Sequence, residues 1–125
     1  MYNLKTREVL LHKRDADAAV NPNKWGLFGG LNEAGETPEE CLIREWQEEL
    51  NITVEAKDLI PLCNYLNAEH NTWRHVFFME SALKKSEMIL GEGEDFDWIS
   101  LDKAFDLDLT KSTRRDLKTF FKLEV

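Results

Sequence analysis

The chain has 125 residues, of which 42% are hydrophobic and 32% charged, which is typical of one soluble globular domain with a single core. Its formal net charge of −8 argues against a protein that binds duplex DNA or RNA, because such proteins need a basic surface to offset phosphates. The sequence has no apolar run of the ~20 residues that cross a membrane, no signal segment and no cysteine pattern for metal binding, so we expect a cytoplasmic protein.

The first part of the chain predicts a strand followed by a glycine-containing turn. Residues Glu8 to Arg14 are apolar or β-tolerant and precede a polar loop, Asp15 to Asn23, which contains Pro22. Trp25 to Gly30 is a short apolar stretch that ends in two glycines, where the backbone must turn or be approached closely.

The clearest helix begins after Thr37. Thr37 can cap the helix, Pro38 suits its first position, and Glu40 completes a capping box. The helix is expected to end near Leu50, since Asn51 readily adopts the left-handed conformation that closes a helix. The apolar residues expected to face the core are Cys41, Leu42, Ile43, Trp46 and Leu50.

The second half of the chain predicts strands and then helices. The expected strands are Leu59 to Leu66, Trp73 to Leu83 and Phe96 to Ile99, with a loop at Glu87 to Glu94. Ser100 is expected to cap a short helix through Phe105, and a final helix to run from Ser112 to Lys122, with Leu117, Phe120 and Phe121 packing inward. This order predicts an α/β (α+β) fold in which helices cover both faces of a mixed sheet.

Three glutamates of the first helix, Glu45, Glu48 and Glu49, are spaced so that they share one helical face. Like charges at this spacing repel one another, so the cluster needs a partner. One interpretation is a solvated acidic face that Arg44 relieves. The other is a metal site, because clustered carboxylate oxygens suit hard cations such as magnesium or manganese, and Glu36 lies just before the helix.

These residues fall into a pattern with fixed spacing. From Gly30 the chain reads Gly30, five residues, Glu36, seven residues, and then Arg44-Glu45-Trp46-Gln47-Glu48-Glu49-Leu50-Asn51-Ile52. The pattern resembles the Nudix box, and every charged position of that box is filled. The one departure is Asn51 where the family has glycine, and asparagine tolerates the same left-handed conformation. The resemblance implies one Nudix domain over residues 1–125, with the box at 30–52, and an α/β/α sandwich with a mixed β-sheet between helices.

The resemblance extends to both sides of the box. Trp25 to Gly30 is similar to the segment that precedes it, with Phe28 where many members have proline. The stretch from Glu92 to Leu101 is similar to the later segment in which MutT-type members carry one more catalytic or metal-binding carboxylate. In order of preference, that carboxylate belongs to Glu92, Glu94 or Asp95, and each also fits an exposed loop acid.

Family members hydrolyse a nucleoside diphosphate linked to another moiety, with the help of divalent ions. The resemblance implies magnesium- or manganese-dependent hydrolysis, with a MutT-like nucleoside triphosphate pyrophosphohydrolase as the leading interpretation. The alternatives are a nucleotide-sugar hydrolase and a Nudix-fold regulator that binds its ligand without catalysis. The implied partner is a nucleotide, and neither a nucleic-acid polymer nor a membrane is expected. Only residues 1–7 stand where much of the family has a full strand, so we expect a short sheet edge that a homodimer would cover.

The motif match also implies roles for individual residues. The implied metal ligands are Glu36, Glu45, Glu48 and Glu49. Arg44 would orient a box glutamate, and Glu48 or Glu92 would accept the proton of the attacking water. The implied substrate contacts are Phe28, Gly29, Gly30 and Trp73. Phe28 and Trp73 also fit packing roles. Lys24, Arg74 and His75 could contact phosphate, but each fits an ordinary surface group better.

Overall fold

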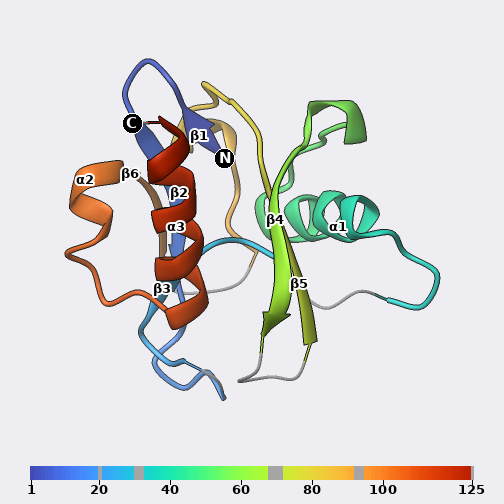
Figure 1. Cartoon of the computed structure of the whole chain (residues 1–125), viewed down its shortest axis with the longest axis horizontal. Coiled ribbons are helices and arrows are strands. Elements are labelled where there is room, and N and C mark those ends of the chain that lie inside the picture. Colours follow the sequence, from blue (N-terminus) through green and yellow to red (C-terminus); the bar gives the residue numbers. More distant parts are fainter. Residues whose placement is uncertain (20, 30–32, 68–71, 92–94, 125) are drawn as a thin grey trace.

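The computed structural model describes residues 1–19, 21–29, 33–67, 72–91 and 95–124 (Figure 1). The elements in chain order are β1 (Tyr2–Asn3), β2 (Glu8–Lys13), β3 (Trp25–Gly26), α1 (Pro38–Leu50), η1 (Ala56–Asp58), β4 (Ile60–Asn67), β5 (Thr72–Phe78), η2 (Lys85–Glu87), β6 (Asp95–Ser100), α2 (Leu101–Ala104) and α3 (Lys111–Glu124), where η marks a 3₁₀ turn. Among the described residues, none of the helices is both long and apolar enough to cross a bilayer.

The strands form two groups, which are joined by a short stretch of backbone hydrogen bonds. β2 pairs antiparallel with β1, β3 and β6, and β4 pairs antiparallel with β5. The segment after β5 then runs parallel to β1: the Tyr2 amide donates to Met79 O over 2.9 Å, and the Ser81 amide donates to Tyr2 O over 2.9 Å. These two bonds join the groups, so the combination of parallel and antiparallel contacts confirms the predicted mixed arrangement.

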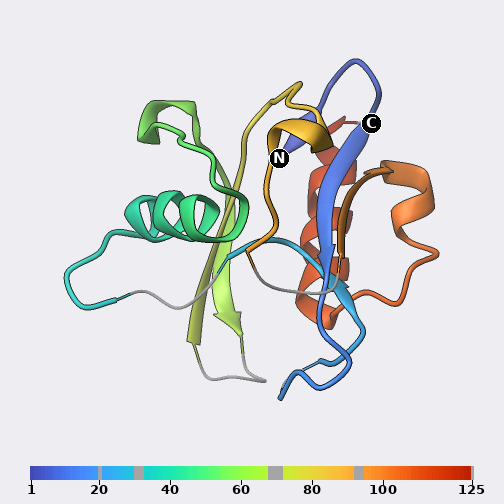
Figure 2. The same ribbon diagram turned by 180° about the vertical axis from the view of Figure 1, so that it is seen from behind.

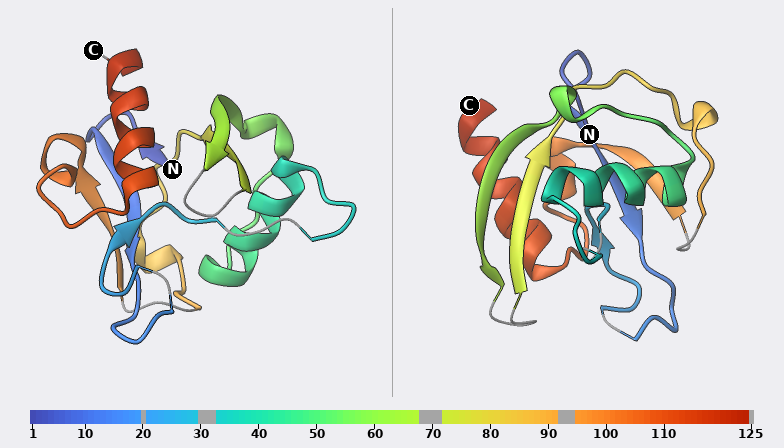
Figure 3. Two further views of the ribbon diagram at one scale, coloured as in Figure 1. Left: turned by 60° about the horizontal axis from the view of Figure 1, so that its bottom comes forward. Right: turned by 90° about the vertical axis from the view of Figure 1, so that its right-hand side faces the viewer.

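The β4–β5 hairpin is the middle of three layers. α1 and α3 lie on opposite sides of it (Figures 1 and 3). Successive β5 residues point to opposite faces: Phe77 packs in the core cluster that contains Trp46 of α1, whereas Phe78 meets the Phe120 ring of α3 at a centroid distance of 5.3 Å. This alternation confirms the predicted fold of helices on both faces of strands.

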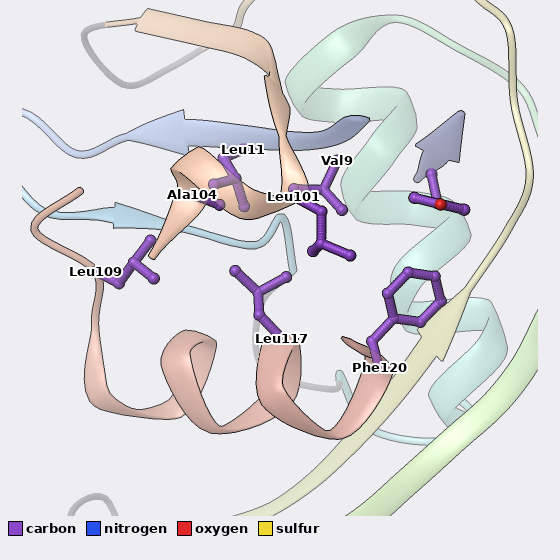
Figure 4. Close-up of a cluster of buried hydrophobic side chains, with 8 residues drawn as sticks. Val9, Leu11, Leu101, Ala104, Leu109, Leu117 and Phe120 are labelled. Atoms are coloured by element: carbon purple, nitrogen blue, oxygen red, sulfur yellow. The ribbon is translucent and has the colours of Figure 1, made fainter. Parts of the chain in front are cut away.

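β2 is the most deeply buried strand because it is covered on both faces. Val9 and Leu11 belong to the cluster with α2 and α3 (Figure 4), and seen from behind, β2 lies in front of α3 (Figure 2). Leu10 points the other way, into the cluster with Trp46 of α1, and is 1% exposed. A continuous apolar run is what a strand covered on both faces requires.

The boundaries of the predicted helices and strands held to one or two residues except at the end of β5, and two unpredicted strands and one helix cap also differ from expectation. The strand expected from Trp73 to Leu83 ends at Phe78, because the chain leaves β4 there to run beside Tyr2. Two strands of two residues each, β1 and β3, escaped prediction because they are too short to show an alternating pattern. The Ser100 side chain makes no capping bond to α2, which is four residues long.

The N-terminal edge differs from expectation as well. A full strand is absent before β2 in the described chain, but β1 occupies that place and lies between β2 and the segment around Glu80. The exposed edge that motivated the homodimer is therefore covered by the chain itself, and the homodimer stays a prediction without that support.

Candidate functional site

The position of α1 is fixed at both ends by its own sequence. The Glu40 amide donates to the Thr37 hydroxyl over 3.1 Å, and the Thr37 amide donates to the Glu40 carboxylate over 3.0 Å. At the other end Asn51 takes φ 53° and ψ 42°, and its amide donates to Gln47 O. The capping box and the left-handed cap confirm the predicted start and end of the helix. Because both ends are fixed, the direction in which each side chain of α1 points is fixed as well.

Arg44 is the centre of an acidic cluster. Its Nε and Nη2 atoms donate to the two carboxylate oxygens of Glu36 over 2.8 and 3.1 Å. Its Nη1 atom donates to Glu45 over 3.1 Å and to Glu48 over 3.2 Å, and lies 3.6 Å from the Glu33 carboxylate. We call Arg44 with these four glutamates the α1 cluster.

The α1 cluster carries more negative charge than its arginine can balance. The Arg44 bond lowers the pKa of Glu36, with a further contribution from the Glu33 amide, so this carboxyl is ionised at neutral pH. The same contact with Glu36 raises the pKa of Arg44 above its ordinary value. The Glu36 and Glu45 side chains are 16% and 13% exposed, so their charges are only partly screened by water. Such an excess of carboxylate oxygen favours a hard divalent cation.

Glu49 lies deeper, and the chain beside it passes unusually close. The Glu49 side chain is buried, and the Gly91 amide donates to Glu49 O over 2.6 Å. A Cβ atom at Gly91 would come within 2.5 Å of Glu48 O, so only glycine fits there without a shift. Sequence reasoning saw Gly91 merely as a loop residue. Gly91 allows the backbone to lie directly against α1, one residue before Glu92 in the chain.

Of the three candidates for the additional carboxylate after the box, the structure describes one. Glu92 and Glu94 lie outside the described residues. Asp95 is described: its carboxylate lies 3.3 Å from Lys85 Nζ, and its side chain is 52% exposed. Among the described residues, Asp95 pairs with Lys85 and with no member of the α1 cluster, so it fits an exposed surface acid, although it begins β6 and does not lie in a loop.

The described residues contain no group of three His, Cys, Asp or Glu side chains already arranged around an ion position. The carboxylates instead converge on Arg44. Their chemistry nevertheless fits a divalent cation, because they are oxygen donors that outnumber the positive charge among them. The metal-binding roles of Glu36, Glu45, Glu48 and Glu49 therefore remain predictions.

A cavity of about 350 Å³ lies beside the inner face of α1. Its walls come from α1, from β2 and the segment after β3, from β5 and from the start of α3. The predicted substrate contacts Phe28, Gly29 and Trp73 all line it, and Gly30 lies outside the described residues. Trp73 is 66% exposed, which disfavours a core role for it. A volume of this order suits a small ligand.

His12 also lines the cavity, although sequence reasoning assigned it no role. Its ring stacks on Phe28 with centroids 4.6 Å apart. Burial lowers its pKa below the ordinary value, so the imidazole is neutral at neutral pH. Its Nδ1 atom is buried without a hydrogen-bond partner among the described residues. A buried polar atom of this kind is uncommon in proteins.

A second arginine and carboxylate meet on the other side of the hairpin. Asp116 of α3 is 1% exposed and accepts from Tyr65 Oη over 2.7 Å and from Arg74 Nε over 2.8 Å. Arg74 also lines the cavity, so its interpretation as an ordinary surface group is wrong. Sequence reasoning missed Asp116, since its partners lie 42 and 51 residues away along the chain.

Comparisons with known proteins agree with this geometry. A family model described as "NUDIX domain" matches residues 1–121. The nucleoside triphosphatase NudI of Enterobacter sp. (strain 638) is 30% identical over 115 residues, which cover 84% of this chain and 82% of that protein. The 8-oxo-dGTP diphosphatase of Escherichia coli (strain K12) is 32% identical over 97 residues, which cover 78% of this chain and 73% of that protein.

Solved structures show the same likeness in three dimensions. The MutT protein from Methanosarcina mazei Go1 has a TM-score of 0.74 and 28% identity, and the match covers 98% of this chain and 88% of that one. A MutT Nudix hydrolase from Burkholderia pseudomallei has a TM-score of 0.72 and 27% identity, over 94% of this chain and 92% of that one.

Proposed function

Because this chain belongs to the Nudix hydrolase family, we propose that it is a magnesium- or manganese-dependent pyrophosphohydrolase that acts on nucleoside triphosphates. The α1 cluster carries this proposal: four carboxylates share one guanidinium and leave an excess of negative charge. A triphosphate can approach such a surface only together with divalent cations, since phosphate and carboxylate oxygens repel one another.

Two further observations support the choice of substrate. A relative at 30% identity is a nucleoside triphosphatase, and one at 32% identity is an 8-oxo-dGTP diphosphatase. The cavity also lies against α1, since Pro38, Cys41, Leu42 and Trp46 line it. A nucleoside in the cavity would thus have its phosphates near the helix that bears the glutamates. These observations favour a nucleoside triphosphate over a nucleotide sugar, for which the chain offers no specific feature.

In this mechanism the glutamates hold the cation and Arg44 holds the glutamates. We assign Glu45, Glu48 and Glu49 as the ligands, and Glu36 as the residue that anchors Arg44 through its two-pronged bond. These residues would hold a divalent cation, which would supply positive charge to neutralise the phosphate oxygens and help to align the water with phosphorus. Arg44 fixes the Glu45 and Glu48 side chains by hydrogen bonds of 3.1 and 3.2 Å before substrate arrives.

Proton transfer needs a carboxylate that is free to accept. Glu48 is the described candidate, because its side chain is 57% exposed and its bond to Arg44, at 3.2 Å, is the longest of those that Arg44 donates to carboxylates. Glu92 is the second candidate: it follows Gly91, whose backbone lies against Glu49 O. A base in either position would take the proton of the attacking water as its oxygen bonds to phosphorus.

The test is a pyrophosphate- and phosphate-release screen over nucleoside triphosphates and nucleotide sugars, with magnesium or manganese. We expect wild type to hydrolyse at least one triphosphate, and Glu49→Gln to lose about 100-fold or more of that rate, since a charged group at the reaction centre is removed. Glu39→Gln is the matched control, because Glu39 lies on the same helix but is neither an assigned metal ligand nor a member of the α1 cluster. It should keep the wild-type rate.

Two results would count against the proposal. Hydrolysis of nucleotide sugars alone would move the substrate to the second class. Nucleotide binding without any hydrolysis, in wild type and both variants, would make the box a structural feature of a binding protein.

A further inference from the structure

The buried carboxylate of Asp116 is bound on both of its oxygens. Tyr65 donates to Oδ1, and Arg74 donates to Oδ2 through both Nε and Nη2 over 2.8 Å. Tyr65 and Arg74 are cross-strand neighbours on β4 and β5, and the Arg115 guanidinium stacks over the Tyr65 ring at 3.7 Å. Three elements of the fold therefore hold one carboxylate and one guanidinium in place.

Stability alone does not account for such a pair. Taking two charges out of water costs about as much as their attraction returns, and apolar residues of similar size serve a core as well. Burial in fact raises the pKa of Asp116, although Arg74 and Tyr65 act in the opposite direction. What the pair provides is a fixed orientation, because a guanidinium held through Nε and Nη2 cannot rotate away.

Arg74 reaches the cavity, and its guanidinium has one nitrogen beyond the two that bind Asp116. Arg74 lines the cavity, and its side chain is 28% exposed, whereas that of Asp116 is 1% exposed. Both recorded bonds of Arg74 use Nε and Nη2, and no partner of Nη1 is recorded in the part of the chain that the structure describes. A charged donor beside a cavity, with its direction set from behind, is a binding group for an acceptor atom.

We propose that Arg74 donates from Nη1 to an acceptor atom of the nucleotide in the cavity, and that Asp116 is the positioning residue for this contact. The proposal rests on the proposed function, since it names a contact within the same substrate site. Two parts of a nucleotide offer suitable acceptors. A phosphate oxygen would be attracted by the positive charge of the guanidinium. A carbonyl oxygen or ring nitrogen of a base such as guanine would instead accept a hydrogen bond from its directed N–H group.

The experiment is steady-state kinetics with ATP, GTP, CTP and UTP on wild type and Arg74→Lys, with the preferred metal. Lysine keeps the charge but loses the planar fork, so KM should rise about tenfold while kcat stays within about twofold. Asp116→Asn keeps Arg74 but removes the ion pair that fixes its orientation, so KM should rise by a smaller factor. Arg114→Lys is the control: Arg114 lies on α3 but donates to Phe105 O and Leu107 O and does not line the cavity, so KM should not change.

The pattern across the four substrates identifies the acceptor. An equal rise in KM for all of them places Arg74 on a phosphate, and a rise confined to one base places it on that base. A double variant, Arg74→Met with Asp116→Asn, leaves no unpaired buried charge and still offers Tyr65 an acceptor. If this variant melts near the wild-type temperature, it is folded, and a wild-type KM for every substrate would then show that substrate binding does not need Arg74, which overturns the proposal.

Failure of the proposed function gives a different result. If wild type hydrolyses no triphosphate, the same four nucleotides are titrated by calorimetry into wild type and Arg74→Lys. Weaker binding to the variant supports the Arg74 contact even without hydrolysis. Equal dissociation constants, or no binding to either protein, overturn it.

Discussion

Two arginine–carboxylate groups flank the β4–β5 hairpin, and they are built in opposite ways. In the α1 cluster, one arginine faces four glutamates, all from residues 33 to 48. In the second group, which we call the α3 pair, Arg74 meets a single carboxylate, Asp116, from a distant part of the chain. The α1 cluster is partly open to solvent, whereas the carboxylate of the α3 pair is almost fully buried.

The difference concerns what each group lacks. The α3 pair is balanced in charge, and both oxygens of its carboxylate already accept hydrogen bonds. What it can still offer a ligand is a hydrogen bond donated by Arg74. The α1 cluster has more carboxylate than arginine, so its remaining capacity is for a cation. The presence of an arginine–carboxylate contact would not by itself tell the two groups apart. Charge balance and burial separate a cation site from a positioning device.

The largest effect should come from the centre of the α1 cluster. Arg44→Lys keeps a positive charge but cannot hold Glu36 through two nitrogens while also binding Glu45 and Glu48. We expect kcat/KM to fall about 10- to 100-fold, the usual cost of losing a group that orients metal ligands. The metal concentration needed for half-maximal activity should rise in parallel, which a magnesium titration measures.

Arg114→Lys makes the same exchange on α3, away from both arginine–carboxylate groups, and should leave kcat/KM unchanged. If Arg44→Lys also retained wild-type activity and metal dependence, the α1 cluster would be a solvated acidic face. The contrast with the α3 pair would then lose its functional meaning.

A smaller effect is expected from the α3 pair, and it depends on pH. Burial raises the pKa of Asp116 above its ordinary 3.8, against Arg74, Tyr65 and Arg115. The folded state thus favours the protonated acid, and this contribution to stability is full below the unfolded value and lost as pH rises through the folded one. Asp116→Asn cannot ionise. Relative to wild type, its free energy of unfolding should rise by about 1 kcal/mol as pH increases from 4 to 7.

Urea unfolding of wild type and Asp116→Asn across that pH range measures the difference. The Tyr65 hydroxyl and the nearby Cys63 thiol both have raised pKa values and do not titrate in this window. A constant difference between the two proteins would show that Asp116 ionises alike in the folded and unfolded states. The opposite slope would show that Arg74 outweighs burial.

The same contrast explains what the sequence could predict. α1 and its glutamates follow from local signals: a cap, a proline at the first helical position, and charges at helical spacing. The α3 pair joins residues 42 positions apart, and nothing in the local sequence around Arg74 or Asp116 indicates their contact. The end of β5 was misplaced for a related reason, since pairing with Tyr2 decides it. The close approach of Gly91 to α1 likewise depends on tertiary packing.

The smallest effect should come from the end of α1. Asn51 has a positive φ of 53°, a conformation that glycine adopts without steric cost, and its side chain contributes an exposed bond of 3.0 Å from Gln47. Asn51→Gly should therefore stabilise the fold by about 0.5 kcal/mol or less, because the relief of backbone strain is partly offset by the lost bond and by a more flexible unfolded chain.

Activity is the informative readout for this variant. The glutamates of the α1 cluster are held by Arg44 and by the capping box at the far end of the helix, so Asn51→Gly should leave kcat/KM at the wild-type level. A change in activity comparable to that of Arg44→Lys, at unchanged stability, would mean that the C-terminal cap takes part in placing Glu48 and Glu49. The α1 cluster would then depend on the same kind of long-range support as the α3 pair, since Gly91 and Ile89 contact the helix at this end.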